Sequence, residues 1–135
     1  MAPLPDDIRE LLERRNFAHV ATVLPDGSPH TVAVWIGVED GHVAFFTQPG
    51  SRKARNLARD PRVAISLVDL DQPYRAAHLR GRVVGTVEGE EALELIDRLS
   101  VKYTGEPFPM RSGVVYLIEP ERSGFFELPF RHTPG

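Results

Sequence analysis

The sequence predicts a β-dominated α+β domain, a small antiparallel barrel with helices at its periphery. Two observations lead to this fold class. Short runs rich in β-branched and aromatic residues recur between turn residues, and three segments carry apolar residues at helical spacing. The chain has 135 residues, which is the size of one ordinary domain, so we expect a single domain over residues 1–135.

The first elements follow from local pattern. Residues 5–13 predict a short amphipathic helix with an aspartate as N-cap and one isoleucine and two leucines on its apolar face. Residues 17–24 and 30–36 predict a hairpin around a Pro-Asp-Gly turn. We expect its second strand to run on into the Glu-Asp-Gly turn at 39–41, and residues 42–47 to return beside it. Three sequential antiparallel strands result.

The middle of the chain predicts a helix and further strands. Residues 51–60 predict a short helix, stopped by the proline that follows, and residues 63–68 predict a fourth strand. Residues 74–87 predict either two strands or one long bent strand, because Gly81 and Gly85 are typical of bulges or tight bends in a curved sheet.

The last part of the chain predicts a regular helix and the closing strands. Residues 90–103 carry apolar residues at helical spacing, with glutamates early and basic residues late, as the helix dipole favours. After a loop that contains two prolines, residues 114–118 and the shorter segment 124–127 predict the closing strands. The total is about six or seven strands and three helices.

Composition excludes several classes of protein. The formal charge of -3 argues against a chain held to nucleic acid or an anionic membrane by overall charge, so neither partner is expected. The absence of cysteine excludes disulfides, cysteine nucleophiles and thiolate metal sites. The N-terminus lacks the pattern of an export signal, and no apolar run approaches the roughly 20 residues of a membrane span. We therefore expect a cytoplasmic protein.

Catalytic constellations are not recognisable in the sequence. The five histidines lack the spacing of metal ligands, so no metal site is expected. No Ser-His-Asp or paired-carboxylate arrangement stands out either, and no catalytic residue is assigned.

The helix predicted at 51–60 begins with the wrong charges for its dipole. If Ser51 is the N-cap, Arg52 and Lys53 occupy the first turn and Arg55 follows, where each cation costs about 0.3–1 kcal/mol. A phosphate at that end would accept hydrogen bonds from backbone N–H groups, hydroxyls and the bases together. The alternative is a solvated basic helix face without a ligand.

The same segment carries a resemblance to a known family. Residues 45–67 resemble the phosphate-binding segment of the pyridoxamine 5'-phosphate oxidase-like split-barrel flavoproteins. Residues 21–35, 79–84 and 93–105 resemble the branch of small actinobacterial reductases that use the deazaflavin coenzyme F420. The resemblance covers nearly the whole chain and implies a split β-barrel homodimer with cofactor sites between the subunits.

The resemblance also implies individual binding residues. It implies that the cofactor phosphate is held by a hydroxyl residue at the end of the third strand and by the Ser-Arg-Lys run, and that the ring lies along the second strand through backbone contacts. Whether the tryptophan of that strand is core or cofactor contact stays open. The implied cofactor-binding residues are Val32, Ala33, Val34, Trp35, Thr47, Ser51, Arg52 and Lys53, with Arg55 and Asn56 matching the deazaflavin branch.

The expected function is that of an F420-dependent oxidoreductase, which passes hydride between the deazaflavin and a small or planar organic substrate. The oxidases hold the FMN phosphate with basic residues on the second strand, and residues 31–36 contain none. Two alternatives stay open. One is an FMN-dependent oxidase or reductase of the pyridoxamine 5'-phosphate oxidase type, and the other is a non-catalytic flavin-binding protein.

Overall fold

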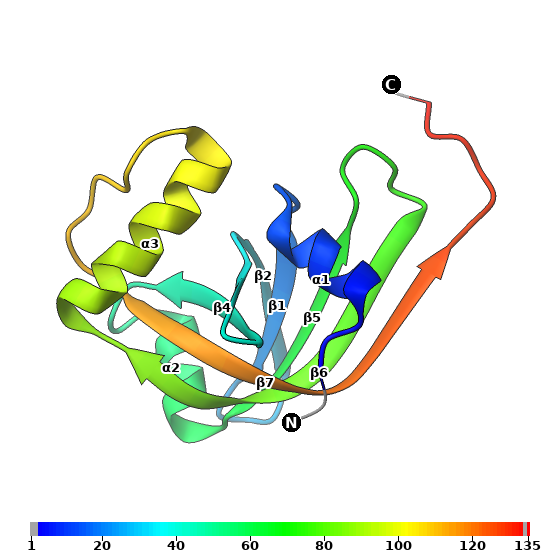
Figure 1. The fold of residues 1–135 in the computed structure, drawn as a ribbon. Coiled ribbons are helices and arrows are strands. Elements are labelled where there is room, and N and C mark those ends of the chain that lie inside the picture. The colour runs from blue at the N-terminus through cyan, green and yellow to red at the C-terminus, as the bar shows by residue number, and fades with distance from the viewer. Residues whose placement is uncertain (1–2, 134) are drawn as a thin grey trace.

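The computed structural model describes residues 3–133 and 135, which form one antiparallel sheet with three helices around it (Figure 1). The predicted fold class and the predicted number of elements are confirmed. No helix in the described part of the chain is both long and apolar enough to cross a bilayer. In chain order the elements are α1 (Asp6–Glu13), β1 (Ala18–Val23), β2 (Pro29–Val34), β3 (Gly37–Glu39), β4 (His42–Thr47), α2 (Arg52–Arg59), β5 (Arg62–Val68), β6 (Arg75–Val87), α3 (Gly89–Thr104) and β7 (Val114–Glu127).

The strands β2 and β3 follow each other in the chain but are not paired in the sheet. The strand order is β2-β1-β5-β6-β7-β4-β3, so β2 and β3 lie at opposite edges although only two residues separate them in the chain. The prediction of three sequential antiparallel strands is therefore wrong, because β4 pairs with β3 and β7 and not with β2. The chain leaves the sheet at Trp35 and Ile36, where polar side chains of α3 replace a strand neighbour for Ile36.

The strands β6 and β7 form the long bent centre of the sheet. Residues 75–87 make one strand, with register shifts after Arg80 and after Val83. At Gly81 a Cβ atom would lie 2.1 Å from the backbone oxygen of Glu119, so only glycine allows this close approach. The two predicted closing strands are one continuous strand, since the residues between them also pair with β6 and Pro120 sits opposite Gly81 at the bulge.

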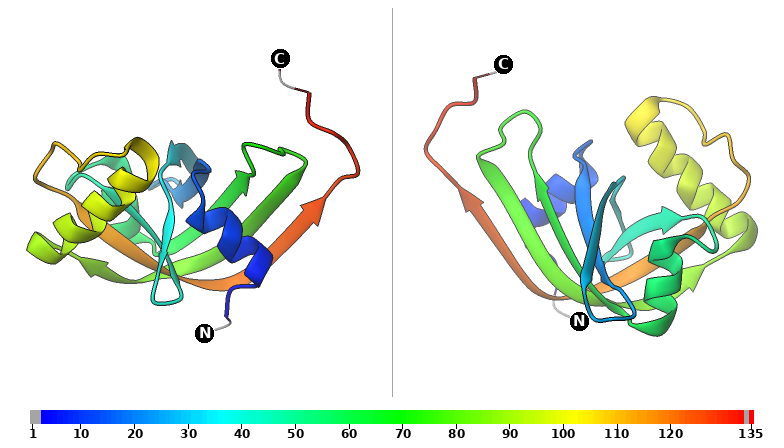
Figure 2. Two further views of the ribbon diagram at one scale, coloured as in Figure 1. Left: turned by 45° about the horizontal axis from the view of Figure 1, so that its top comes forward. Right: turned by 180° about the vertical axis from the view of Figure 1, so that it is seen from behind.

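The helices close the barrel and frame one end of it. α1 buries its isoleucine and two leucines in the core, but the predicted aspartate cap is wrong: Pro5 occupies the N-cap and makes no side-chain hydrogen bond. The carboxylate of Asp7 instead accepts from the N–H of Ile8 at 2.8 Å. α2 and α3 lie toward the same end of the molecule, on either side of β4, whereas the C-terminal segment extends away from them (Figures 1 and 2).

Candidate functional site

The first turn of α2 is built around two hydroxyl groups. Ser51 is the N-cap, as predicted, and its Oγ accepts from the N–H of Ala54 at 3.1 Å. Thr47, the last residue of β4, donates its hydroxyl to the same Oγ at 2.9 Å. Gly50 between them has φ 80°, and a Cβ atom there would meet nothing within 4 Å. The backbone before the helix is therefore open to a close approach.

The cations of this turn have no acidic partner. The first turn of α2 holds Arg52 and Lys53 and no acid, and neither forms an ion pair with any residue that the structure describes. Both are half-buried, and burial lowers the pKa of Lys53. A partly desolvated ammonium without a counterion at a helix N-terminus favours an anionic ligand. Arg55 lies one turn on and is exposed.

A cavity of about 440 Å³ joins Lys53 to an aromatic wall, and its size is typical of a small-molecule site. Three rings form the wall in edge-to-face contact: Trp35 lies 6.1 Å from both Phe46 and Phe108, and the centroids of the latter two are 5.1 Å apart. The cavity is lined by Phe17, Ala33, Val34, Trp35, Phe46, Lys53 and Phe108.

Behind the aromatic wall, α3 fixes the position of Trp35. The ring of Tyr103 stacks on the indole at 5.2 Å with 7° between the planes. The Tyr103 hydroxyl accepts from the N–H of Ile36 at 3.1 Å and donates to the carbonyl of Asn16 at 2.5 Å. The break between β2 and β3 is therefore held by a side chain of α3. Burial raises the pKa of Tyr103.

Lys102 supports the same break from the neighbouring position. Its Nζ donates to the carbonyl oxygens of Leu12, at 3.1 Å, and Ile36, at 2.5 Å. Burial lowers the pKa of Lys102 to about 8, while the charge of Glu13 acts in the opposite direction. From the sequence alone, Lys102 is only a basic residue near the C-terminus of a predicted helix. The carbonyls that it binds are distant in the chain, so no local pattern indicates them.

The structure brings most, but not all, of the predicted binding residues together. Ala33, Val34, Trp35 and Lys53 line the cavity. Thr47 and Ser51 meet at the start of the helix that carries Lys53 and Arg52. Phe17, Phe46 and Phe108 were missed, because their positions in the sequence resemble those of ordinary core or loop residues.

Two predicted residues lie elsewhere. Val32 pairs with Val20 on the neighbouring strand and does not line the cavity. Asn56 is fully buried, and its Nδ2 donates to the hydroxyl of Thr22 at 3.0 Å, while its Oδ1 has no hydrogen-bond partner among the described residues. This contact braces α2 against β1, and a role of Asn56 toward a cofactor stays a prediction.

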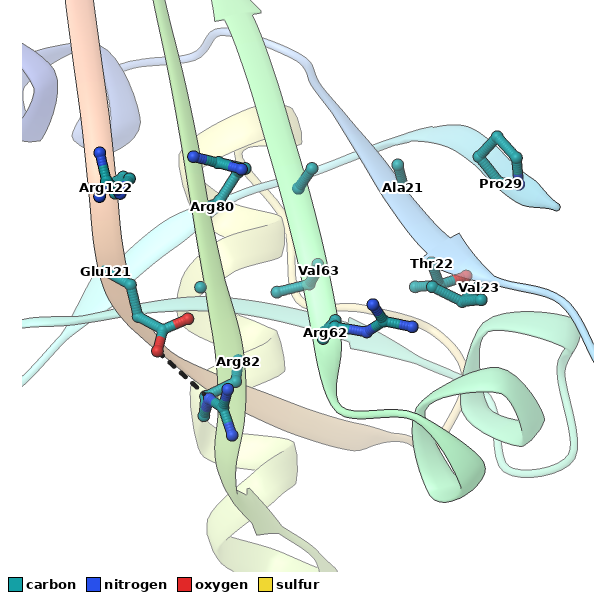
Figure 3. Close-up of a pocket in the computed structure, with 12 residues that line it drawn as sticks. Ala21, Thr22, Val23, Pro29, Arg62, Val63, Arg80, Arg82, Glu121 and Arg122 are labelled. Carbon is teal, nitrogen blue, oxygen red and sulfur yellow. Dashed lines mark hydrogen bonds and ion pairs between the residues drawn. The ribbon is translucent and has the colours of Figure 1, made fainter. Parts of the chain in front are cut away.

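A larger cavity, of about 550 Å³, lies on the solvent side of the sheet (Figure 3). Arginines of β5, β6 and β7 line it, and two cross-strand pairs face each other in register: Arg62 with Arg82, and Arg80 with Arg122. Acidic residues offset part of this charge, since Glu121 lies 3.3 Å from Arg82. No aromatic residue lines this cavity, so the smaller one is the better candidate for a ring-containing ligand.

Comparison with known proteins gives the family. Residues 4–125 match the pyridoxamine 5'-phosphate oxidase family. The chain belongs to this family. The predicted resemblance is therefore confirmed, and the family match covers all seven strands except the last two residues of β7.

Two relatives point to different branches of the pyridoxamine 5'-phosphate oxidase family. The chain is 32% identical over 119 residues to an F420H(2)-dependent biliverdin reductase of Mycobacterium tuberculosis. This match covers 86% of this chain and 85% of the reductase. It is 38% identical over 76 residues to a pyridoxine/pyridoxamine 5'-phosphate oxidase of Bacteroides thetaiotaomicron. That match covers 56% of this chain and 35% of the oxidase, so the chain spans about a third of the oxidase's length.

Solved structures agree with the split-barrel fold of the family. An F420 reductase superimposes with a TM-score of 0.79 at 31% identity, covering 90% of this chain and 98% of the reductase. A conserved hypothetical protein of Mycobacterium tuberculosis gives a TM-score of 0.80 at 29% identity, covering 100% of this chain and 94% of that one. Together with the biliverdin reductase, the F420 reductase supports the predicted likeness to the deazaflavin branch.

Proposed function

We propose that the protein is an F420-dependent oxidoreductase that transfers hydride between the deazaflavin and a small or planar organic substrate. The observation that carries this proposal is the cavity in which Lys53, at the start of α2, lies beside the aromatic wall of Trp35, Phe46 and Phe108. Lys53 has no acidic partner among the residues that the structure describes. It offers an anion site and a ring site side by side, as a phosphorylated ring cofactor requires. Relatives that are named for F420 support the choice of cofactor.

The residues at the start of α2 fit the phosphate. The start of α2 brings together the hydroxyls of Ser51 and Thr47 and the open backbone at Gly50, and its first turn carries Arg52 and Lys53. Charge-assisted hydrogen bonds from such a cluster are stronger than neutral ones. The exposed guanidinium of Arg55 extends the positive charge along the helix, where it would meet the anionic tail that continues past the phosphate of F420.

The end of β2 fits the ring. Ala33 and Val34 line the cavity beside Trp35, and Tyr103 holds the indole from behind. When bound, the deazaflavin supplies the hydride chemistry. The protein's own residues hold the ring against the strand, exclude water with aromatic side chains and leave the rest of the cavity to the substrate.

The proposal includes a homodimer, as the family resemblance implies. Several apolar side chains at the end of β7 and beyond it are about half exposed, namely Phe126, Leu128 and Phe130. A second subunit would cover such side chains. Light scattering at micromolar concentration is expected to give the mass of two chains, and a single-chain mass would contradict the dimer. The cytoplasmic location stays a prediction.

A parallel titration tests the cofactor. Trp35 is the only tryptophan and lines the cavity, so quenching of its fluorescence reports binding directly. Protein made in a host without F420 is expected to be colourless, to bind F420 with micromolar or better affinity, and to bind FMN at least about tenfold more weakly, a difference of about 1.4 kcal/mol. Protein that purifies yellow with stoichiometric FMN would instead favour the FMN-dependent alternative.

Turnover separates an enzyme from a cofactor-binding protein. Reduced F420 is expected to be oxidised in the presence of a planar acceptor such as a quinone or a linear tetrapyrrole, at a rate that depends on acceptor concentration. Tight binding of F420 without oxidation by any acceptor of these classes would support the non-catalytic alternative.

A further inference from the structure

One wall of the aromatic cavity comes from a loop and not from the sheet. Trp35 follows directly on β2 and Phe46 belongs to β4, but Phe108 lies in the connection of residues 105–113 between α3 and β7. Its ring nevertheless contacts both others edge to face, with interplanar angles of 80° to Trp35 and 75° to Phe46. A loop residue holds such a position only if the loop itself is fixed.

Asp97 of α3 fixes the loop at Phe108. Its Oδ1 accepts from the N–H of Phe108 at 3.1 Å, and its two carboxylate oxygens accept from the Arg111 guanidinium at 3.0 and 3.1 Å. Arg111 also donates to the carbonyl oxygen of Phe108 at 2.9 Å. The backbone of Phe108 is thus bound at both its N–H and its C=O, and the bidentate ion pair makes the arrangement specific in geometry. The Arg111 guanidinium lowers the pKa of Asp97.

The two ends of the loop are also tied. Ser100 donates to the carbonyl of Glu106 at 2.7 Å, near the beginning. Near the end, the Gln48 side-chain amide donates to the carbonyl of Ser112 at 2.8 Å and accepts from its hydroxyl at 2.6 Å. At Gly113 a Cβ atom would lie 2.5 Å from the Ile96 side chain, so the loop passes tightly over α3. Phe108 therefore lies between fixed points.

We infer that Phe108 determines the size of the ring system that the cavity admits, and that Asp97 is the positioning residue that holds Phe108 in place. This inference rests on the proposed function in so far as it treats the cavity as the ring site. A fixed ring rejects ligands that need its space, whereas a mobile one would swing aside for them. Because Lys53 also lines the cavity, the favoured ligand is a planar ring system of limited size that carries an anionic group.

Two matched probes test the size limit without any cofactor. Naphthalene-1-sulfonate and pyrene-1-sulfonate carry the same anion on two and four fused rings, and each is expected to quench the fluorescence of Trp35. The unaltered protein is expected to prefer the smaller probe. In Phe108→Ala the ratio of the two dissociation constants is expected to shift at least about tenfold toward pyrene-1-sulfonate. Val84→Ala, a truncation of an exposed apolar side chain outside the cavity, is expected to leave the ratio unchanged.

The positioning role of Asp97 has its own test. Asp97→Asn removes the ion pair with Arg111 but keeps a polar group of the same shape, and is expected to shift the ratio about threefold in the same direction as Phe108→Ala. Asp97→Glu, which retains the charge, is expected to restore part of the selectivity. A ratio unchanged in both Phe108→Ala and the milder Phe108→Leu would overturn the size limit, and a ratio unchanged in Asp97→Asn would overturn the positioning role. Failure of F420 to bind would affect only the proposed function, since neither probe requires it.

Discussion

The helices α2 and α3 begin with opposite charges. α3 carries Glu90 and Glu91 in its first turn and Lys102 in its last, which is the arrangement that the helix dipole favours. α2 carries Arg52 and Lys53 in its first turn and no acid there. The N-caps of the two helices also differ. The N-cap of α2 is a serine whose side chain accepts a hydrogen bond from the first turn, whereas the N-cap of α3 makes no side-chain hydrogen bond.

The difference separates charge that stabilises a helix from charge that serves a ligand. The acidic start of α3 is exposed and lines neither of the two cavities described above, and its charges suit the helix dipole. The basic start of α2 opposes its own dipole and lies beside an aromatic cavity. Helix termini whose charges are locally unfavourable are therefore the places to look for an anion site.

The largest expected effect is a loss of cofactor binding when the basic residues at the start of α2 are removed. Replacing both Arg52 and Lys53 with alanine is expected to weaken cofactor binding by about 2–4 kcal/mol, because charge-assisted contacts to the phosphate are lost. The fold should be unaffected, as circular dichroism would show. Arg80→Ala combined with Arg122→Ala removes the same number of cations from the solvent side of the sheet and serves as the control. Equal affinity in the α2 double variant and the unaltered protein would contradict the site.

The next effect concerns the last turn of α3. The pKa of Lys102 is about 8 in the folded protein and 10.5 in the unfolded chain, so between these pH values the unfolded chain binds the proton and the folded protein does not. Stability that depends on Lys102 therefore rises with pH over this range. Thermal unfolding of the protein and of Lys102→Met, compared between pH 7.5 and 10, is expected to show the unaltered protein gaining relative to the variant. A difference in Tm that stays constant with pH would contradict the lowered pKa of Lys102.

The cap of α2 gives a smaller effect on stability. Ser51→Ala removes the acceptor for the N–H of Ala54 and for the Thr47 hydroxyl, and is expected to cost about 1 kcal/mol in the free energy of unfolding. Denaturant unfolding measures this. Ser51→Asp restores a capping acceptor and should recover the stability, but its negative charge should repel the phosphate and keep cofactor binding weak. Recovery of both properties would mean that the phosphate does not approach this residue.

The smallest expected effects are changes in stability when the charge in the first turn of α2 or α3 is reversed. Arg52→Glu is expected to stabilise the cofactor-free protein by about 0.3–1 kcal/mol, and Glu90→Lys is expected to destabilise it by a similar amount. Denaturant midpoints at low ionic strength detect both, and added salt should reduce both. The same sign for the two changes would show that the dipole does not govern these termini.

The local sequence pattern predicted most helices and strands. The errors lie where contacts with residues distant in the chain determine how a strand begins, ends or pairs. The start of α2 was predicted from its own charges, and Ser51 does cap it. The break after β2 was missed because the group that binds the Ile36 amide is Tyr103, which is 67 residues away. The continuity of β7 through Pro120 was missed because it depends on a bulge in β6.

The candidate site divides in the same way. Lys53 and Ser51 could be predicted because a cation and a cap at a helix start are visible in one short segment, and their role toward a cofactor stays a prediction. Phe46 and Phe108 were missed because the aromatic wall joins a strand, a strand end and a loop. Nothing in the local sequence distinguishes these rings from core residues.

The Lys102 contacts bear on the order in which the molecule assembles. This side chain joins α3 to carbonyls 90 and 66 residues earlier in the chain, and closing such long loops is slow. The hairpins of the sheet need only short loops, so we expect them to form first and the cavity beside Trp35 to take shape late, when α3 docks. A protein that folds in this order acquires its binding site as one of its last native features, and a bound ligand would then slow unfolding by retaining α3 on the sheet.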